Sequence, residues 1–196
     1  TARCALVALP PLVAAQIPYT PPLPQARSRL MGQMSMGDTL KCIVLYETSF
    51  WRERGYSGES ISHSGHITFG FDNTSHDGVQ PSLVAFVTGA RARALRERSV
   101  QELRSVIEEE LSRYFGEEAT RSVGFEVEDW SAEPWSMGGP TAAPPPGALT
   151  EAQCALAQPV GPIFWAGTET ASEWCGFMEG AVCSGERAAD QILNAL

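Results

Sequence analysis

Short apolar runs separated by turn-forming residues dominate the hydrophobic pattern of the chain. The strongest run, Thr39–Tyr46, combines aliphatic and β-branched residues and predicts a strand. Two weakly alternating segments, 59–63 and 66–71, flank Ser64 and Gly65 and predict a β-hairpin. Further apolar runs, each bounded by turn residues, predict strands at 4–9, 83–88, 122–127 and 162–166.

Apolar positions at helical spacing predict two longer helices. The first begins at Ser99, which can form a capping box with Glu102, and it stops at Gly116. Its apolar face consists of Val100, Leu103, Val106, Ile107, Leu111 and Phe115. The second helix covers 177–196, with an apolar face expected at Met178, Ala181, Val182, Gly185, Ala189, Ile192, Leu193 and Leu196. Together with a shorter helical segment at 27–34, the pattern favours an α+β fold with a mixed β-sheet.

Composition then excludes two classes of protein. The 196-residue chain has a formal net charge of -9, so it lacks the basic surface typical of nucleic-acid binding. No apolar run reaches the roughly 18 residues that a membrane-spanning helix needs. The apolar opening to Leu12 lacks the layout of a signal peptide, and the start at Thr1 instead of Met leads us to expect upstream sequence.

Neither the cysteines nor the histidines indicate a disulfide framework or a metal site. The cysteines are odd in number and form no CxxC pair, so we expect buried free thiols and a reducing compartment. They are Cys4, Cys42, Cys154, Cys175 and Cys183. His63 and His66 are three residues apart, which on a strand sends their rings to opposite faces, so no metal is expected there.

The stretch 164–187 carries the most informative chemistry: a strand, a tight turn, a loop and a helix start crowded with small residues. Its glycines at 167, 176, 180 and 185 would let a backbone or a flat ring approach closely. The helix start presents free N–H groups and the positive end of the dipole, which suits an anion or a ring that becomes anionic on reduction. The alternative is a small-residue helix packed against a sheet.

This stretch resembles the C-terminal signature of the flavin-containing amine oxidases, most closely the monoamine oxidases. The family's AGTET turn stands at 166–170, its W-S-G-Y-M-E-G-A segment at 174–181 and its A-G-E-R-A-A segment at 184–189. The resemblance covers essentially the whole chain but matches only the C-terminal part of a family member. The other similar segments are 9–11, 21–24, 40–44, 50–52 and 130–147.

The resemblance implies a fold, a cofactor and a reaction. It implies the end of an FAD-binding segment at 1–10, a substrate-binding domain at 11–128 and a C-terminal FAD-contact segment at 129–196. The last belongs to a Rossmann-like domain whose N-terminal half, with its GxGxxG turn, is missing from this sequence. The reaction would be FAD-dependent oxidation of an amine to an imine and then an aldehyde, with oxygen reduced to hydrogen peroxide.

Lys41 is the residue with the clearest implied catalytic role. It matches the family lysine that holds a water near flavin N5, and it is the only lysine in the chain. An ammonium within an apolar strand is costly unless it is paired or loses its proton, so such a lysine could organise water for flavin reoxidation. The alternative is a lysine whose ammonium reaches solvent.

Further positions match cofactor contacts of the family. Met178 matches the residue whose backbone N–H approaches the pyrimidine side of the flavin, and Trp130 matches a tryptophan packed near it; an ordinary buried aromatic is the alternative for Trp130. The implied cofactor-binding residues are Trp130, Gly167, Thr168, Glu169, Gly176 and Met178.

Two departures from the monoamine oxidases bear on chemistry. Gly139 stands where their cysteine is bonded to the flavin, and no cysteine lies between Cys42 and Cys154, so noncovalent FAD is expected. Their substrate passes between two tyrosines; Phe177 keeps one ring as a catalytic and substrate-facing residue, and Pro140 loses the other. Cys175 lies beside this half cage, with a buried thiol as the alternative to a flavin contact.

Other functions remain open beside a monoamine oxidase. The missing second ring also suits a polyamine or L-amino-acid oxidase of the same superfamily, or a non-catalytic binding module that retains the fold. The partners expected are a small amine and oxygen, with no nucleic acid and no membrane association of this chain; a homodimer is an open alternative. The location would be cytoplasmic, or the mitochondrial outer membrane if a C-terminal tail follows.

Overall fold

The computed structural model describes residues 1–148 and 155–196, so Cys154 lies outside the described part. The chain forms two compact units, which we describe separately: unit 1 comprises 1–37 and 133–196, and unit 2 comprises 38–132. Residues 11–37 thus belong to the same unit as the C-terminal segment. The expected substrate-binding domain at 11–128 and FAD-contact segment at 129–196 are defined by what they bind, whereas the two units are defined by internal contacts. That division by binding stays a prediction.

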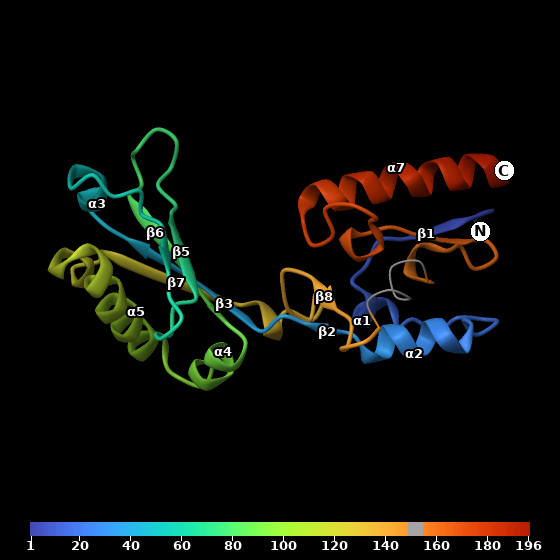
Figure 1. Cartoon of the computed structure of the whole chain (residues 1–196), viewed down its shortest axis with the longest axis horizontal. Helices are drawn as coiled ribbons and strands as arrows, with labels where there is room; N and C mark the ends of the chain where they lie inside the picture. The colour runs from blue at the N-terminus through green and yellow to red at the C-terminus, as the bar shows by residue number, and fades with distance from the viewer. Residues whose placement is uncertain (149–154) are drawn as a thin grey trace. The chain divides into compact units, whose positions relative to one another are not determined.

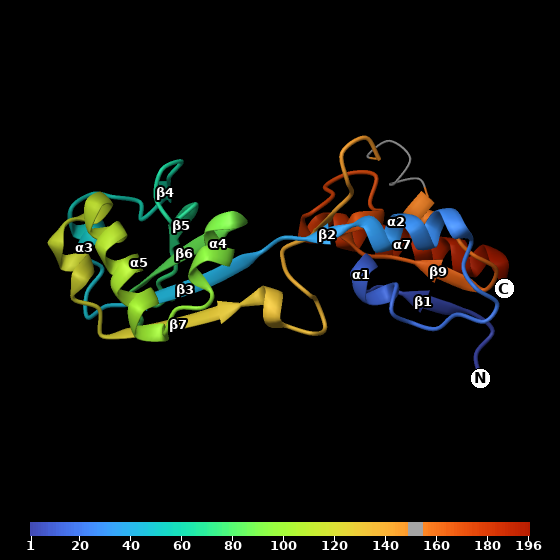
Figure 2. The same ribbon diagram turned by 90° about the horizontal axis from the view of Figure 1, so that it is seen from below.

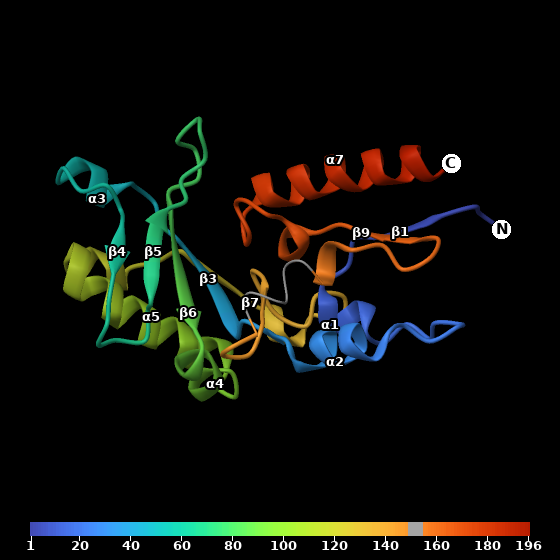
Figure 3. The ribbon, with the colours of Figure 1, turned by 45° about the vertical axis from the view of Figure 1, so that its right-hand side comes forward.

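Unit 2 is built on a five-stranded sheet with the order β4-β5-β6-β3-β7, in which neighbouring strands run antiparallel (Figure 3). Its strands are β3 (Thr39–Leu45), β4 (Ser60–Ile61), β5 (Phe69–Asp72), β6 (Ser82–Thr88) and β7 (Gly124–Asp129). Its helices are α3 (Phe50–Glu53), α4 (Ala90–Leu95), α5 (Val100–Phe115) and the 3-10 turns η1 (Glu117–Thr120) and η2 (Trp130–Ala132).

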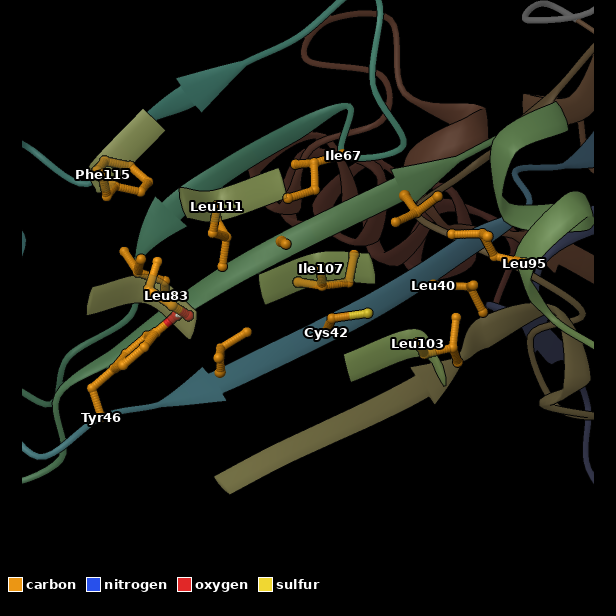
Figure 4. Packing of buried hydrophobic residues seen from close by; sticks show 14 of the residues in the cluster. Leu40, Cys42, Tyr46, Ile67, Leu83, Leu95, Leu103, Ile107, Leu111 and Phe115 are labelled. Atoms are coloured by element: carbon orange, nitrogen blue, oxygen red, sulfur yellow. Dashed lines mark hydrogen bonds between the residues drawn. The ribbon is translucent and has the colours of Figure 1, made fainter. Parts of the chain in front are cut away.

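Helix α5 covers one face of this sheet and closes the core of unit 2 (Figure 4). The predicted capping box is confirmed: Ser99 Oγ accepts from Glu102 N at 3.3 Å, and Ser99 N donates to Glu102 Oε2 at 2.9 Å. Side chains from helix and sheet interdigitate, as burial of apolar surface requires. The labelled core residues are Leu40, Cys42, Tyr46, Ile67, Leu83, Leu95, Leu103, Ile107, Leu111 and Phe115.

An aromatic cluster closes the end of the core near α3. Trp51 is fully buried, with its ring 5.6 Å from that of Tyr46 and 5.0 Å from that of Phe50. The Trp51 Nε1 donates to Asp72 Oδ2 at 2.8 Å, so the buried indole N–H has its partner. Burial alone would raise the pKa of Asp72, but hydrogen bonds from Arg52, Trp51 and Thr74 outweigh it and hold that pKa well below its usual range.

Unit 1 contains two two-stranded pairs. Strand β1 (Ala5–Val7) runs parallel to β9 (Ile163–Trp165), and β2 (Ser35–Met36) runs antiparallel to β8 (Ala142–Ala143). The β1–β9 pair lies between α7 on one side and α1 and α2 on the other (Figures 1 and 3), and Figure 2 shows α2 in front of α7. These helices are α1 (Pro11–Ala14), α2 (Gln25–Gln33), the 3-10 turn η3 (Thr168–Thr170) and α7 (Met178–Ala195).

The α+β class is confirmed, and so are the predicted hairpin and the two longer helices. Parallel and antiparallel pairing both occur, but in different units: the parallel pair is β1–β9, whereas the five-stranded sheet is antiparallel. Helix α4 was not predicted, because its sequence ARARAL alternates apolar and basic residues and gives no helical period. Within the described ranges, no helix is both long enough and apolar enough to cross a membrane.

The predicted apolar face of the last helix is wrong. Its buried residues are Gly180, Ser184 and Ala188, whereas Met178 and Val182 are exposed. Small side chains face the rest of unit 1 because strand β9 and turn η3 lie close against the helix, and bulkier residues would hold them apart.

The expectation of buried thiols holds for one cysteine. Cys42 is fully buried in the core of unit 2, and burial raises its pKa to about 12. Cys4 and Cys183 are half-buried, and Cys175 is exposed, so the alternative of a buried thiol at Cys175 is wrong. All four of these described cysteines are free.

Candidate functional site

The candidate site is the connection from β9 through η3 to the start of α7. Two glycines mark its bends, with φ of 110° at Gly167 and 89° at Gly176. Residues with a Cβ adopt such angles only with strain, so both bends require glycine. Gly180 is needed for another reason, because a Cβ there would lie 2.2 Å from the carbonyl oxygen of Trp174.

Side chains of helix α7 hold the Gly167–Thr170 turn in place through hydrogen bonds. Gly167 N donates to Ser184 Oγ at 2.9 Å, and Ser184 is 1% exposed. Arg187 donates to the carbonyl of Trp165 at 3.0 Å and to Thr170 Oγ1 at 2.9 Å. Sequence reasoning gave Ser184 and Arg187 no role, although both stand in the 184–189 motif. Their spacing of three residues places both side chains on the face of the helix that meets the turn.

Thr168 fastens the turn to the beginning of α7. Gly176 N donates to Thr168 Oγ1 at 2.6 Å, and that hydroxyl donates to the carbonyl of Phe177 at 3.0 Å. The turn and the helix start therefore form one hydrogen-bonded unit.

The start of α7 has no side-chain cap. Phe177 occupies the N-cap position with extended φ and ψ of -113° and 161°. Its side chain has no oxygen that could accept from the first N–H groups of the helix. Met178 is 89% exposed, and the ring of Phe177 is also exposed, with that of Trp174 6.1 Å away at a right angle. Backbone donors and an aromatic edge thus meet on the surface of unit 1, next to the Gly167–Thr170 turn.

Glu169 joins a further segment to this turn. It is 8% exposed, and its Oε1 accepts from Ala142 N at 2.9 Å and from Thr141 Oγ1 at 3.0 Å. Both donors follow directly on Pro140, which is exposed. The structure therefore brings seven of the predicted site residues into one hydrogen-bonded region of unit 1: Pro140, Gly167, Thr168, Glu169, Gly176, Phe177 and Met178.

The two remaining site residues, Lys41 and Trp130, belong to unit 2. Lys41 is half-buried in the middle of β3, and because Leu40 and Cys42 point into the core, its side chain lies on the opposite face of the sheet. Its cross-strand neighbours are Phe86 and Glu128. Within residues 1–148 and 155–196, no hydrogen bond or ion pair of its ammonium is found.

Trp130 lies in η2, immediately after β7, and is 39% exposed, so it is not an ordinary core aromatic. Sequence reasoning missed the ion pairs that hold this end of the sheet. Arg96 donates to Asp38 Oδ1 at 2.7 Å and lies 3.4 Å from Asp129 Oδ2. It thereby ties the residue before β3 to the last residue of β7, on the strands that lead to Lys41 and Trp130.

Comparison with known proteins assigns the chain to a family. The family model described as flavin containing amine oxidoreductase matches residues 1–193. Flavin-containing amine oxidase B of Mus musculus is 39% identical over 198 residues, covering 100% of this chain and 38% of its own length. A probable flavin-containing monoamine oxidase A of Dictyostelium discoideum is 38% identical, covering 97% of this chain and 42% of its own length.

Solved structures agree with this assignment. Cyclohexylamine oxidase from Brevibacterium oxydans superposes with a TM-score of 0.93 at 34% identity, over 99% of this chain and 43% of that protein. Wild-type putrescine oxidase bound to putrescine gives a TM-score of 0.91 at 35% identity, over 98% of this chain and 43% of that protein. The chain thus spans about two-fifths of the length of these relatives, and it belongs to the family of flavin-containing amine oxidoreductases.

Proposed function

We propose that this chain supplies the flavin-edge and amine-facing surfaces of an FAD-dependent amine oxidase. The observation that carries the proposal is the uncapped start of α7, fastened by Thr168 to the turn that begins at Gly167. When bound, the flavin would take two electrons from the amine and pass them to oxygen, giving hydrogen peroxide.

The described residues fit one end of that cofactor. The Met178 N–H has no acceptor within residues 1–148 and 155–196, and it points out of a helix start whose dipole favours a ring carrying negative charge. The bends before that donor are made by Gly167 and Gly176, both at positive φ, which contribute no side chain there. We infer that Met178 N–H binds the pyrimidine edge and that the backbone of the turn contacts the cofactor. A contact of the Trp130 indole with the cofactor is what the resemblance implies.

Attachment of FAD would be noncovalent. Gly139 occupies the position at which the monoamine oxidases have the cysteine that is bonded to the flavin. No cysteine lies between Cys42 and Cys154. A glycine has no side chain that could form a bond to the flavin. Denaturing the protein should therefore release all of the flavin into solution.

Phe177 and Pro140 would face the amine. The exposed ring of Phe177 offers a π-face to a cationic or aromatic substrate, and Pro140 offers a saturated ring of smaller reach. One aromatic wall instead of two favours an aliphatic or extended amine over a flat aromatic one. The relatives named for cyclohexylamine and putrescine support this direction. A polyamine or an L-amino acid is the second candidate, favoured by the same missing ring.

Peroxide release across substrate classes tests the proposal. The flavin-loaded protein is given an aromatic monoamine, an aliphatic monoamine, a diamine, a polyamine and an L-amino acid, and flavin content is measured by visible absorption before and after acid precipitation. We expect peroxide from at least one amine class, with aliphatic amines ahead of aromatic ones. A protein that carries flavin but releases no peroxide with any of them would point to the non-catalytic binding module.

A further inference from the structure

Thr168 and Glu169 are adjacent in the η3 turn, and each holds one of the two segments that carry Phe177 and Pro140. Thr168 bonds to Gly176 N and to the carbonyl of Phe177. Glu169 accepts from Thr141 and Ala142, directly after Pro140. The spacing between Phe177 and Pro140 is therefore set through the turn between their anchors.

The turn itself is firmly fixed. Gly167 N bonds to the buried Ser184, and Arg187 bonds to Thr170 and to the carbonyl of Trp165. The two held segments are also neighbours, since a Cβ built on Gly176 would lie 3.5 Å from Thr141 Cγ2. A change at Glu169 would accordingly displace the Pro140 side of the site, because the Phe177 side keeps its own anchor at Thr168.

We propose that Glu169 is a positioning residue whose buried carboxylate sets the separation of Pro140 and Phe177, and thereby selects which amines fit between them. This inference rests on the proposed function of those two positions. It goes beyond the resemblance, which only places Glu169 in a turn touching the cofactor.

What Glu169 supplies is an accepting oxygen at a fixed place. Removing it leaves the buried N–H of Ala142 without a partner, and an unsatisfied buried donor favours movement of its segment. A glutamine keeps an accepting oxygen in nearly the same position but carries no charge. Glu169→Gln should therefore behave like the wild type if position matters, and like Glu169→Leu if the charge acts directly on the cofactor.

Hydrogen exchange gives the readout that does not depend on flavin. Exchange of the Ala142 amide is measured in the wild type, Glu169→Leu and Glu169→Gln, with Glu186→Leu, an exposed position on α7, as the matched control. We expect exchange at least about tenfold faster in Glu169→Leu, and no change in the other two variants. Unchanged protection in Glu169→Leu would overturn the positioning role.

Substrate selectivity gives the second readout. In flavin-loaded protein, the ratio of kcat/KM for a bulky and a small aliphatic monoamine should shift by about tenfold in Glu169→Leu at unchanged flavin content, and stay at the wild-type value in Glu169→Gln. An unchanged ratio, or loss of selectivity in both variants, would overturn the proposal. If Glu169→Leu does not fold, Thr141→Val removes one of the two donors instead and must shift the ratio in the same direction.

These measurements separate two kinds of failure. If the wild-type protein takes up no flavin, both the proposed function and this inference are wrong. If the wild-type protein oxidises amines and substitutions at Glu169 leave its substrate selectivity unchanged, only the positioning role is wrong.

Discussion

Replacing Lys41 by methionine is expected to slow oxygen-dependent turnover by about a hundredfold or more, the range in which a positioned proton-handling group contributes. Lys41 stands in mid-strand on the face opposite the core, and no partner for its ammonium is found in the described residues. We propose that it holds a water and stabilises negative charge as oxygen is reduced, as the resemblance implies. Methionine is unbranched and nearly as long, and it removes the charge together with the N–H donors of the ammonium.

The measurement separates the two halves of the reaction. Bleaching of the flavin by amine under anaerobic conditions should keep its wild-type rate in Lys41→Met, whereas recovery of the flavin colour after oxygen is admitted should be slow. Ile43→Met, on the same strand and the same face, is the matched control and should leave both rates unchanged. Wild-type oxygen reactivity in Lys41→Met would show that the proposed role is wrong.

Trp51→Ala is expected to destabilise unit 2 by about 3–5 kcal/mol, the usual cost of deleting a large core aromatic. The indole is fully buried, contacts the rings of Tyr46 and Phe50, and donates to Asp72. The deletion leaves a cavity and takes one hydrogen bond from the half-buried carboxylate of Asp72. Denaturant unfolding followed by circular dichroism measures the loss.

An exposed tryptophan supplies the control for that experiment. Trp135 is 78% exposed in unit 1, so Trp135→Ala should change the free energy of unfolding by less than about 0.5 kcal/mol. Trp51→Phe keeps a ring and loses the N–H donor, and it should fall between the two. Equal effects of Trp51→Ala and Trp135→Ala would contradict the packing described for unit 2.

Local signals in the sequence were sufficient for much of the fold. The capping box at Ser99 and Glu102 and the apolar period after it specify α5, because both act within a few residues. The β-branched run at Thr39–Leu45 specifies β3 for the same reason. Both elements could be predicted because the residues that determine them lie within the element itself.

Interactions between distant segments could not be predicted. The buried face of α7 follows from close packing against η3 and β9, so its small residues, such as Ser184, are buried and the larger Val182 is exposed. The same holds for Glu169, whose partners at Thr141 and Ala142 lie more than twenty residues away in the sequence. The motif located these residues, and only the fold shows which segments they join.

The binding of flavin by the start of α7 is tested most directly by removing one backbone donor. Met178 is the first residue of the helix, its side chain is exposed, and the preceding residue is extended, so proline is sterically acceptable there. Met178→Pro deletes the N–H, whereas Met178→Ala keeps it. Flavin affinity, measured by titrating the flavin-free protein, should fall by about tenfold or more in Met178→Pro and stay near the wild-type value in Met178→Ala. Equal flavin affinity in the two variants, with both folded, would contradict the account.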